Sequence, residues 1–264
     1  MNHRPRKSLG QHFLHDRGVI GRILAAVAPQ PGERFVEIGP GRGALTLPLL
    51  DVPVELDVVE VDRGLAAALA RDLARPGLRV HCADALKFDF RQLGAPPQGL
   101  RLAANLPYNI STPLLFHLLG QQEVFRDLHV MLQREVVERM TASPGTAAYG
   151  RLTVALAARC RVEKLFIVRP GAFTPPPQVD SAVARLVPDA TLAARIGDPA
   201  AFDRLVARAF SMRRKRLANA LRGLLGEADI AACGVDPGQR PGDVAPPAWI
   251  ALANRHAAAG LPGA

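Results

Sequence analysis

Hydrophobic residues in the first 190 or so positions fall into two alternating patterns. Short apolar runs rich in Val, Ile and Leu predict buried strands, and longer stretches with apolar residues three or four apart predict helices. This alternation predicts an α/β fold with a mainly parallel sheet covered by helices on both faces. The runs, strand-like and helix-like together, are Asp16–Ala28, Phe35–Ile38, Leu45–Leu50, Val54–Val61, Leu65–Leu73, Leu78–His81, Leu102–Ala104, Leu114–Leu119, Leu128–Leu132, Glu135–Met140, Leu152–Cys160, Lys164–Val168 and Ala182–Val187.

Proline and glycine residues separate the predicted elements in the remainder of the chain. Four prolines between Pro170 and Pro177 separate the last two strand-like runs, which suits a final hairpin added antiparallel to the sheet. After Pro188 no strand pattern remains, and short helical segments alternate with Gly/Pro-rich turns. We therefore expect two domains, residues 1–188 with a basic N-terminal arm at 1–15, and a small all-helical domain at 189–264.

Charge is concentrated in two places. The chain of 264 residues carries a formal charge of +9, with a net +4 in residues 1–22 and a net +7 in residues 204–222, so the rest is close to neutral. Local basicity of this kind is typical of a surface that follows nucleic-acid phosphates. The sharpest cluster is Arg213-Arg214-Lys215-Arg216, which is followed by apolar residues at helical spacing and predicts the basic start of an RNA-binding helix. A solvated helical face is the other interpretation.

The cysteine pattern and the distribution of apolar residues limit the expected cofactors and cellular location. The three cysteines are widely spaced and form no Cys-x-x-Cys pair, so neither disulfides nor a zinc site is expected, and no metal is assigned. No window approaches 18 apolar residues and the N-terminus lacks an apolar signal core, which predicts a cytoplasmic protein that does not enter membranes. We expect a monomer.

The tetrapeptide Asn105-Leu106-Pro107-Tyr108 lies on a loop between two predicted elements. A short buried strand, Arg101 to Ala104, precedes it, and a helix from Ser111 to Leu119, with Ser111 or Thr112 as N-cap, follows it. In an open α/β sheet, ligands bind where strands run into such loops. An ordinary strand-ending turn is the plainer interpretation of the tetrapeptide alone.

The chemistry of this loop suits methylation of a nucleobase amino group. The exocyclic nitrogen of adenine is a poor nucleophile because its lone pair is delocalised into the ring. The Asn105 side-chain oxygen and the Leu106 carbonyl can accept the two amino hydrogens and direct the lone pair outward. Pro107 would stiffen the loop, and Tyr108 would offer a flat face for stacking the base. Phe173, on a loop stiffened by Pro175-Pro176-Pro177, is a second candidate stacking face, unless it is an apolar plug beneath that loop.

Three further strand ends carry groups suited to a nucleotide cofactor. The strand Phe35–Ile38 runs into Gly39-Pro40-Gly41-Arg42-Gly43, a glycine-rich turn that permits close approach of the backbone to a ligand. Glu60 could accept hydrogen bonds from ribose hydroxyls, and Asp84 could meet an adenine amino group. Gly39, Gly41 and Ala44 together with Glu60 also satisfy the dinucleotide-binding pattern, so an NAD-dependent dehydrogenase is an alternative.

Taken together, these motifs identify a family resemblance over nearly the whole chain. The chain resembles the ribosomal RNA adenine N6,N6-dimethyltransferases of the KsgA type. The matching segments are Ser8-Leu9-Gly10-Gln11-His12-Phe13-Leu14, the Glu37–Gly43 loop, Glu60, Asp84, Asn105–Pro113, Tyr149-Gly150-Arg151-Leu152 and Phe173–Ser181.

The resemblance implies a fold, a methyl donor and a substrate. It implies a class I, Rossmann-like methyltransferase with a mixed seven-stranded sheet in residues 1–188 and a small helical RNA-binding domain in residues 189–264. It implies S-adenosylmethionine as donor and, as substrate, two adjacent adenines near the 3′ end of small-subunit (16S) rRNA in a pre-ribosomal 30S-type particle. Donor contacts are implied at His12, Leu14, Gly39, Gly41, Glu60, Asp84 and Asn105, and His12 departs from the Asn that is frequent in the family.

Two other functions stay open at the level of sequence. Methyltransferases that confer antibiotic resistance by modifying large-subunit rRNA share the fold and a similar Asn-x-Pro-Tyr loop. An RNA-binding assembly factor that acts by occupying an immature ribosomal subunit is an alternative of a different class.

Overall fold

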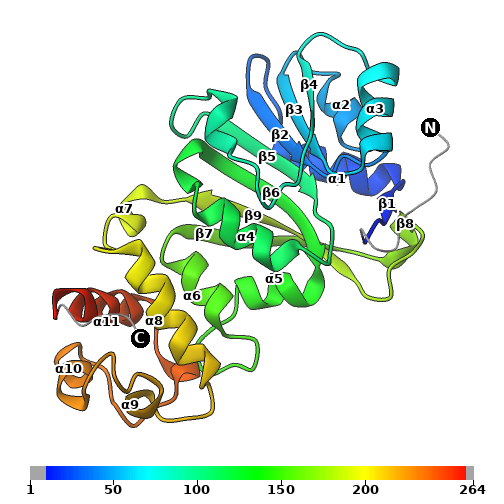
Figure 1. Ribbon diagram of the computed structural model, residues 1–264. Coiled ribbons are helices and arrows are strands. Elements are labelled where there is room, and N and C mark those ends of the chain that lie inside the picture. Colours follow the sequence, from blue (N-terminus) through cyan, green and yellow to red (C-terminus); the bar gives the residue numbers. More distant parts are fainter. Residues whose placement is uncertain (1–9, 260–264) are drawn as a thin grey trace. The chain divides into compact units, whose positions relative to one another are not determined.

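The computed structural model, described for residues 10–259, contains a seven-stranded mixed sheet (Figure 1). The strand order is β4-β3-β2-β5-β6-β9-β7. Neighbouring strands from β4 to β6 run parallel, whereas β9 runs antiparallel to β6. The α/β prediction is therefore confirmed, including the antiparallel addition after the proline-rich loop. The strands are β2 (Arg34–Ile38), β3 (Glu55–Glu60), β4 (Leu78–Cys82), β5 (Leu100–Asn105), β6 (Phe125–Gln133), β7 (Cys160–Val168) and β9 (Ser181–Pro188).

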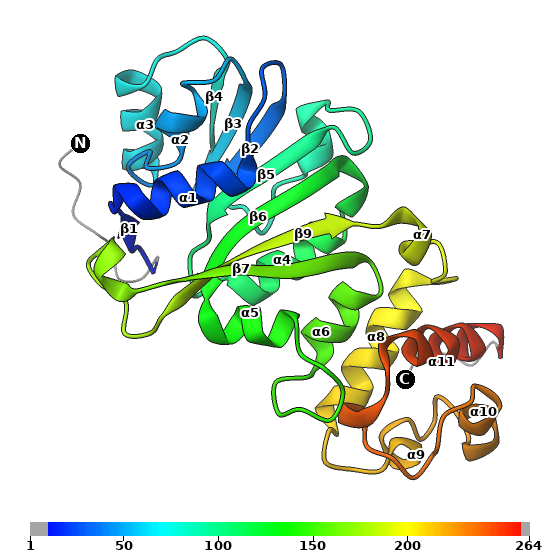
Figure 2. The ribbon, with the colours of Figure 1, turned by 180° about the vertical axis from the view of Figure 1, so that it is seen from behind.

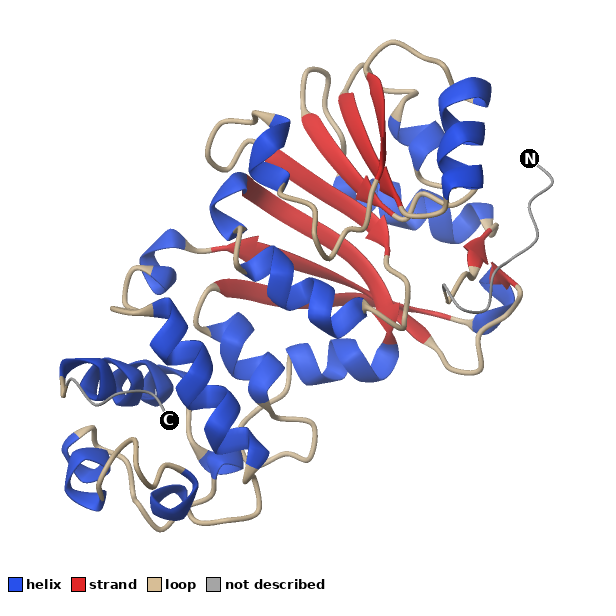
Figure 3. Ribbon diagram, viewed as in Figure 1, coloured by secondary structure: helices blue, strands red, loops and turns tan. Residues whose placement is uncertain are grey.

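Helices cover both faces of the sheet. The helix α1 (Arg17–Val27) lies across the face turned toward the viewer in Figure 2, and α4 (Ser111–Leu119) lies on the face turned toward the viewer in Figures 1 and 3. Strands covered on both faces bury most of their side chains, which explains the mainly hydrophobic runs in the sequence. The other helices that connect the strands are α2 (Thr46–Leu49), α3 (Arg63–Asp72) and α5 (Arg134–Met140).

A second, two-stranded sheet was not predicted. The strand β1 (Phe13–Leu14) pairs antiparallel with β8 (Phe173–Thr174), so that Leu14 lies opposite Phe173. Both side chains are buried in the same apolar core. Strands of two residues are too short for any periodicity to reveal them. Residues 1–9 of the expected basic arm, with Ser8 and Leu9 of the family motif, lie outside the described residues.

The chain divides into two compact units. One comprises Met1–Val137 and Glu163–Pro188, and the other Glu138–Val162 and Asp189–Ala264. In the second unit the Tyr149 hydroxyl donates to the Val244 carbonyl at 2.6 Å, within a core that includes Trp249. This packing explains why residues before position 163 join the C-terminal helices. The functional division of the chain into a catalytic and an RNA-binding domain stays a prediction.

The second unit is helical, as the loss of strand periodicity after Pro188 predicted. Its helices, within the described residues, are α6 (Arg151–Ala157), α7 (Ala190–Ala193), α8 (Pro199–Ser211), α9 (Leu217–Ala220), α10 (Glu227–Ala232) and α11 (Pro246–Ala258).

The capping expected for α4 was wrong. The N-cap residue is Ile110, and its side chain makes no capping hydrogen bond. The Ser111 hydroxyl instead donates to the Tyr108 carbonyl at 3.0 Å. The side chain is thus used to close the Asn105–Tyr108 loop, because a hydroxyl can bond a carbonyl three residues back as well as cap a helix.

Candidate active site

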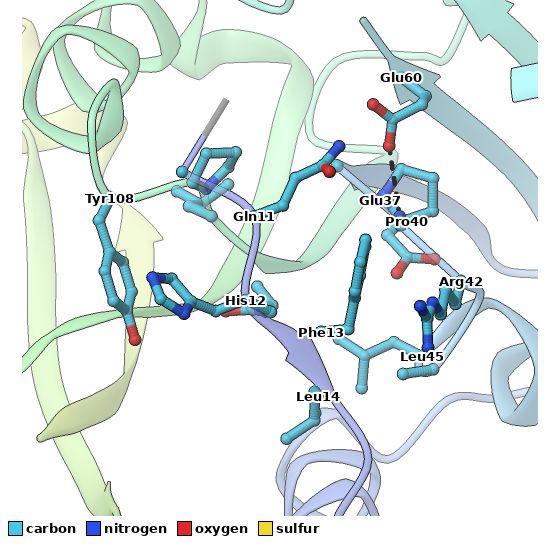
Figure 4. Close-up of a pocket in the computed structure, with 17 residues that line it drawn as sticks. Gln11, His12, Phe13, Leu14, Glu37, Pro40, Arg42, Leu45, Glu60 and Tyr108 are labelled. Carbon is cyan, nitrogen blue, oxygen red and sulfur yellow. Dashed lines mark hydrogen bonds between the residues drawn. The ribbon is translucent and has the colours of Figure 1, made fainter. Parts of the chain in front are cut away.

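Three strand ends meet at one edge of the sheet. The glycine turn follows β2, Glu60 ends β3 and Asn105 ends β5. Because these strands are parallel, their carboxyl ends lie together. With the segment Gly10–Leu14 they form one pocket (Figure 4). Its lining residues are Gly10, Gln11, His12, Phe13, Leu14, Glu37, Gly39, Pro40, Gly41, Arg42, Ala44, Leu45, Glu60, Asn105, Leu106, Pro107 and Tyr108. The pocket therefore brings together six of the seven positions expected to contact a methyl donor.

The glycine turn requires glycine for both conformation and space. Gly39 and Gly41 have φ values of 65° and 58°, in the left-handed region that L side chains rarely adopt. A Cβ at Gly41 would lie 3.0 Å from the Phe13 ring. That ring packs under the Arg42 guanidinium, 4.6 Å from the ring centroid, and lies within the pocket beside Leu45 in Figure 4. The remaining cavity is about 60 Å³.

Glu60 connects the end of β3 to the glycine turn. It is only 4% exposed. One carboxylate oxygen accepts from the Asp62 N–H at 2.9 Å, and the other accepts from the Gly41 N–H at 3.3 Å. Burial raises the pKa of this carboxyl, although the two backbone hydrogen bonds oppose that shift. The backbone donors fix the orientation of the carboxylate, which has lone pairs left to accept from a ligand.

Glu37 is a pocket residue whose role was not predicted from the sequence. It lies on β2, is 2% exposed, and accepts a hydrogen bond from the Thr46 hydroxyl at 2.6 Å. Burial raises the pKa of Glu37 to about 8, with the Thr46 bond opposing the shift and the nearby Glu60 charge adding to it. Glu37 is therefore protonated at neutral pH. An acidic residue inside an otherwise apolar strand was the signal available in the sequence.

The Asn105 amide is oriented by the N-terminal segment. Its Nδ2 donates to the His12 carbonyl at 3.2 Å. Because a carbonyl can only accept, this contact assigns the nitrogen to the His12 side and directs Oδ1 elsewhere. The following residue, Leu106, is held by its N–H, which donates to the Met131 carbonyl at 3.1 Å. The loop thus holds two adjacent carbonyl-type oxygens on a fixed backbone.

Tyr108 is fixed at both its hydroxyl and its ring. The hydroxyl shares a 2.5 Å hydrogen bond with the buried Ser181 hydroxyl. Burial raises the pKa of Tyr108, and the Ser181 bond opposes that shift. The His12 imidazole stacks on the ring, with centroids 5.4 Å apart and planes inclined by 29° (Figure 4). His12 Nδ1 lies 2.8 Å from the Pro175 carbonyl, so this side chain connects Tyr108 to the proline-rich loop.

A second, larger cavity adjoins the first. It measures about 500 Å³, within the range of small-molecule sites. Gly10, Gln11, His12 and Tyr108 line both cavities. The outer wall of the larger cavity is formed by Gln133 and the residues Pro175, Pro176, Pro177, Gln178 and Val179.

Two of the expected site residues are not brought to these cavities. Phe173 is 2% exposed, pairs with Leu14 and belongs to the apolar core, so it fits the apolar-plug interpretation and presents no stacking face to either cavity. Asp84 follows β4 at the same edge as Glu60, but it lines neither cavity. Its carboxylate accepts from the Leu86 N–H at 3.0 Å, which fixes its local turn.

The basic cluster leads into a helix. Residues 213–215 lie in the turn after α8, and Arg216 is the N-cap residue of the short helix α9, so a helix begins at the end of the cluster as the sequence predicted. Arg213 donates to the Thr146 and Ala147 carbonyls at 2.9 and 2.8 Å and thereby clamps a neighbouring loop. Arg214, Lys215 and Arg216 are exposed. The predicted apolar face is confirmed, since Leu217, Leu221 and Leu224 are buried in the core.

Among residues 10–259, no group of three or more His, Cys, Asp or Glu side chains is arranged to hold a metal ion. Within the same range, no helix combines the length and apolar character required to cross a membrane.

The fold defines the general class of protein. A seven-stranded sheet of this order, with a reversed strand next to one edge and a glycine turn after β2, is that of the Rossmann-like class I methyltransferases. A family model described as ribosomal RNA adenine dimethylase matches residues 2–257, and the chain belongs to this family.

Relatives and solved structures agree with this assignment. The ribosomal RNA small subunit methyltransferase A of Nitrosococcus oceani is 54% identical over 253 residues, which cover 96% of each chain. The protein of the same name from Pseudomonas putida is 52% identical, over 97% of this chain and 96% of its own. A dimethyladenosine transferase from Plasmodium falciparum matches with a TM-score of 0.79 and 25% identity, over 96% of this chain and all of that one. The 23S rRNA methyltransferase ErmE matches with a TM-score of 0.67 and 28% identity, over 92% and 98%. The methyltransferase interpretation is confirmed, and the dehydrogenase alternative is not supported.

Proposed function

We propose that the protein transfers methyl groups from S-adenosylmethionine to N6 of two adjacent adenines near the 3′ end of small-subunit rRNA. The observation that carries the proposal is the oriented Asn105 amide, whose Nδ2 donates to the His12 carbonyl, in the pocket that Tyr108 also lines. High identity to two small-subunit methyltransferases favours small-subunit over large-subunit rRNA as substrate.

The residues of the smaller pocket fit the donor. S-adenosylmethionine supplies an electrophilic methyl group when it is bound. The buried Glu60 carboxylate is suited to accept from ribose hydroxyls, and the turn at Gly39 and Gly41 admits a ligand close to the backbone. Gln11 and Phe13 extend into the pocket, so we propose that these side chains move aside when the donor enters. His12, Leu14, Asp84 and Asn105 stay proposed donor contacts.

The Asn105–Tyr108 loop binds the target adenine and orients its amino group for methyl transfer. Asn105 Oδ1 and the Leu106 carbonyl accept the two amino hydrogens of the adenine, so that its lone pair points at the methyl group. The adenine leaves its helix to reach the loop and stacks on Tyr108. For the second transfer the monomethylated amine rotates and offers its remaining hydrogen to the same oxygens. No side chain is assigned as a base, because the nitrogen becomes strongly acidic once methylated.

The remaining parts of the proposal concern RNA docking. Arg214, Lys215 and Arg216 are exposed cations suited to phosphate contacts, whereas Arg213 is engaged with loop carbonyls. We propose that a monomer acts on a pre-ribosomal 30S-type particle, and hence in the cytoplasm.

Methylation with labelled donor tests the proposal. Small-subunit particles that lack the dimethyladenines are the substrate, and large-subunit RNA and free nucleosides are the controls. The proposal expects N6,N6-dimethyladenine in the small-subunit RNA alone. Label in large-subunit RNA would favour the resistance-type alternative, and tight particle binding without label would favour an assembly factor acting by occupancy.

A further inference from the structure

The side chain of His12 lies where the proposed reaction needs the target base. Tyr108 is the aromatic face on which the adenine would stack, and the His12 imidazole already stacks on it at 5.4 Å (Figure 4). Both residues line the 500 Å³ cavity as well as the smaller donor-side pocket. A base cannot occupy the same face of Tyr108 while the imidazole covers it.

The position of His12 is fixed by separate contacts of its ring and its backbone. The ring is held by Tyr108 on its face and by the Pro175 carbonyl, 2.8 Å from Nδ1. The backbone is held by Asn105, whose Nδ2 donates to the His12 carbonyl. Gly10 packs so tightly against Asn109 that a Cβ at Gly10 would lie 2.9 Å from Asn109 Oδ1. The ring can therefore rotate away about its side-chain bonds while the backbone stays docked on the Asn105 loop.

We propose that His12 is a placeholder for the target adenine and a determinant of RNA affinity at the base site. The imidazole stacks on Tyr108 until the adenine takes over that face. The displaced imidazole leaves the Pro175 carbonyl, which frees the proline-rich wall of the larger cavity. The bond between Asn105 Nδ2 and the His12 carbonyl persists, so Asn105 Oδ1 stays oriented as the base arrives. This inference rests on the proposed function, because it concerns the same base site.

The placeholder competes with the substrate, and the size of the competition follows from stacking energies. An aromatic pair of this geometry contributes about a 2- to 10-fold factor to an equilibrium. Removing the imidazole ring therefore strengthens base-dependent RNA binding by about 2- to 10-fold. A ring that stayed in place as a second layer against the adenine would have the opposite effect, because its removal would weaken binding.

The test measures base-dependent RNA affinity without donor. Fluorescence anisotropy with the full chain gives Kd for an RNA hairpin whose loop carries two adjacent adenines, and for the same hairpin with two uridines there. The Kd for the uridine hairpin divided by the Kd for the adenine hairpin cancels the phosphate contacts and reports the preference of the base site for adenine. His12→Asn removes the ring but keeps a polar group for Pro175, and His12→Phe keeps a ring and removes that hydrogen bond. His15→Asn, an exposed histidine three residues away, is the matched control.

The proposal expects the ratio to rise by about 2- to 10-fold in His12→Asn and to stay at or below the wild-type value in His12→Phe and His15→Asn. An unchanged or lower ratio in His12→Asn, with a wild-type preference for adenine intact, overturns the placeholder and leaves the proposed function standing. If the wild-type protein shows no preference for adenine and Tyr108→Ala leaves the Kd ratio unaltered, both the placeholder role of His12 and the proposed function are contradicted.

Discussion

The protonated state of Glu37 gives a prediction that can be worked out in size and sign. Glu37 is buried beside Glu60, and its pKa is about 8 in the folded protein against 4.5 for an ordinary glutamate. Above pH 4.5 the unfolded chain releases this proton while the folded chain retains it. The contribution of Glu37 to the free energy of unfolding is therefore full below about pH 4.5 and is lost as the pH rises through about 8.

The structure also sets the magnitude. Each pKa unit corresponds to about 1.4 kcal/mol, so the free energy of unfolding falls by about 1.4 kcal/mol per pH unit and by on the order of 5 kcal/mol across the whole window. Glu37→Gln keeps an oxygen that can accept from the Thr46 hydroxyl but cannot ionise. We expect this variant to lose less stability than the wild type as the pH rises, and to become the more stable protein at the alkaline end.

Urea unfolding of both proteins at intervals from about pH 3 to pH 9 measures the difference directly, since histidines and other shared groups cancel. Glu33→Gln is a control of opposite sign. Burial acts to raise the pKa of Glu33, but its hydrogen bonds and the charges of Arg101 and Arg126 outweigh burial and lower it. Its contribution is present above the ordinary pKa and is lost as the pH falls through the folded pKa. Parallel stability profiles for wild type and Glu37→Gln would refute the assignment of a buried, protonated Glu37.

Three further predictions concern ligand binding. Glu60→Ala should weaken donor binding by about 1–3 kcal/mol in calorimetry, and unchanged donor affinity would remove Glu60 from the ribose site. Tyr108→Phe should keep base stacking but cost about 1–3 kcal/mol of stability, because it leaves the buried Ser181 hydroxyl without its partner. If Tyr108→Phe showed an adenine preference as weak as that of Tyr108→Ala, stacking would not be the role of the ring. Exchange of exposed Arg214, Lys215 and Arg216 for Gln should flatten the salt dependence of RNA binding by about 0.7–0.9 log units per lost contact, and an unchanged slope would exclude them from docking.

Most of the fold could be predicted because its signals are local. The strand runs before Glu60 and Asn105 are rich in Val, Leu and Ala, as burial on both faces favours, and a shift of one residue at their carboxyl ends did not alter the edge on which they meet. The β1–β8 sheet could not be predicted, because each of its strands is only two residues long and the two strands lie about 160 positions apart in the sequence.

The site was predicted by residue type more reliably than by orientation. Asn105, Glu60 and the glycines lie together because parallel strand ends place them there. The orientation of His12 toward Tyr108 depends on the Pro175 carbonyl, a contact that sequence spacing does not encode. Arg213 looked like its basic neighbours in the sequence, and only the loop carbonyls near it show that it is a structural clamp.

The central claim is that Asn105 prepares the adenine nitrogen for attack. The most direct measurement is the single-turnover rate of N6 methylation of small-subunit particles by wild type and Asn105→Ala, with donor and particle affinities measured in parallel. The account predicts a rate at least about 100-fold lower with both affinities changed far less, as expected for an interaction made mainly in the transition state. A variant that methylates at close to the wild-type rate, or whose loss is explained by weaker donor binding alone, would contradict it.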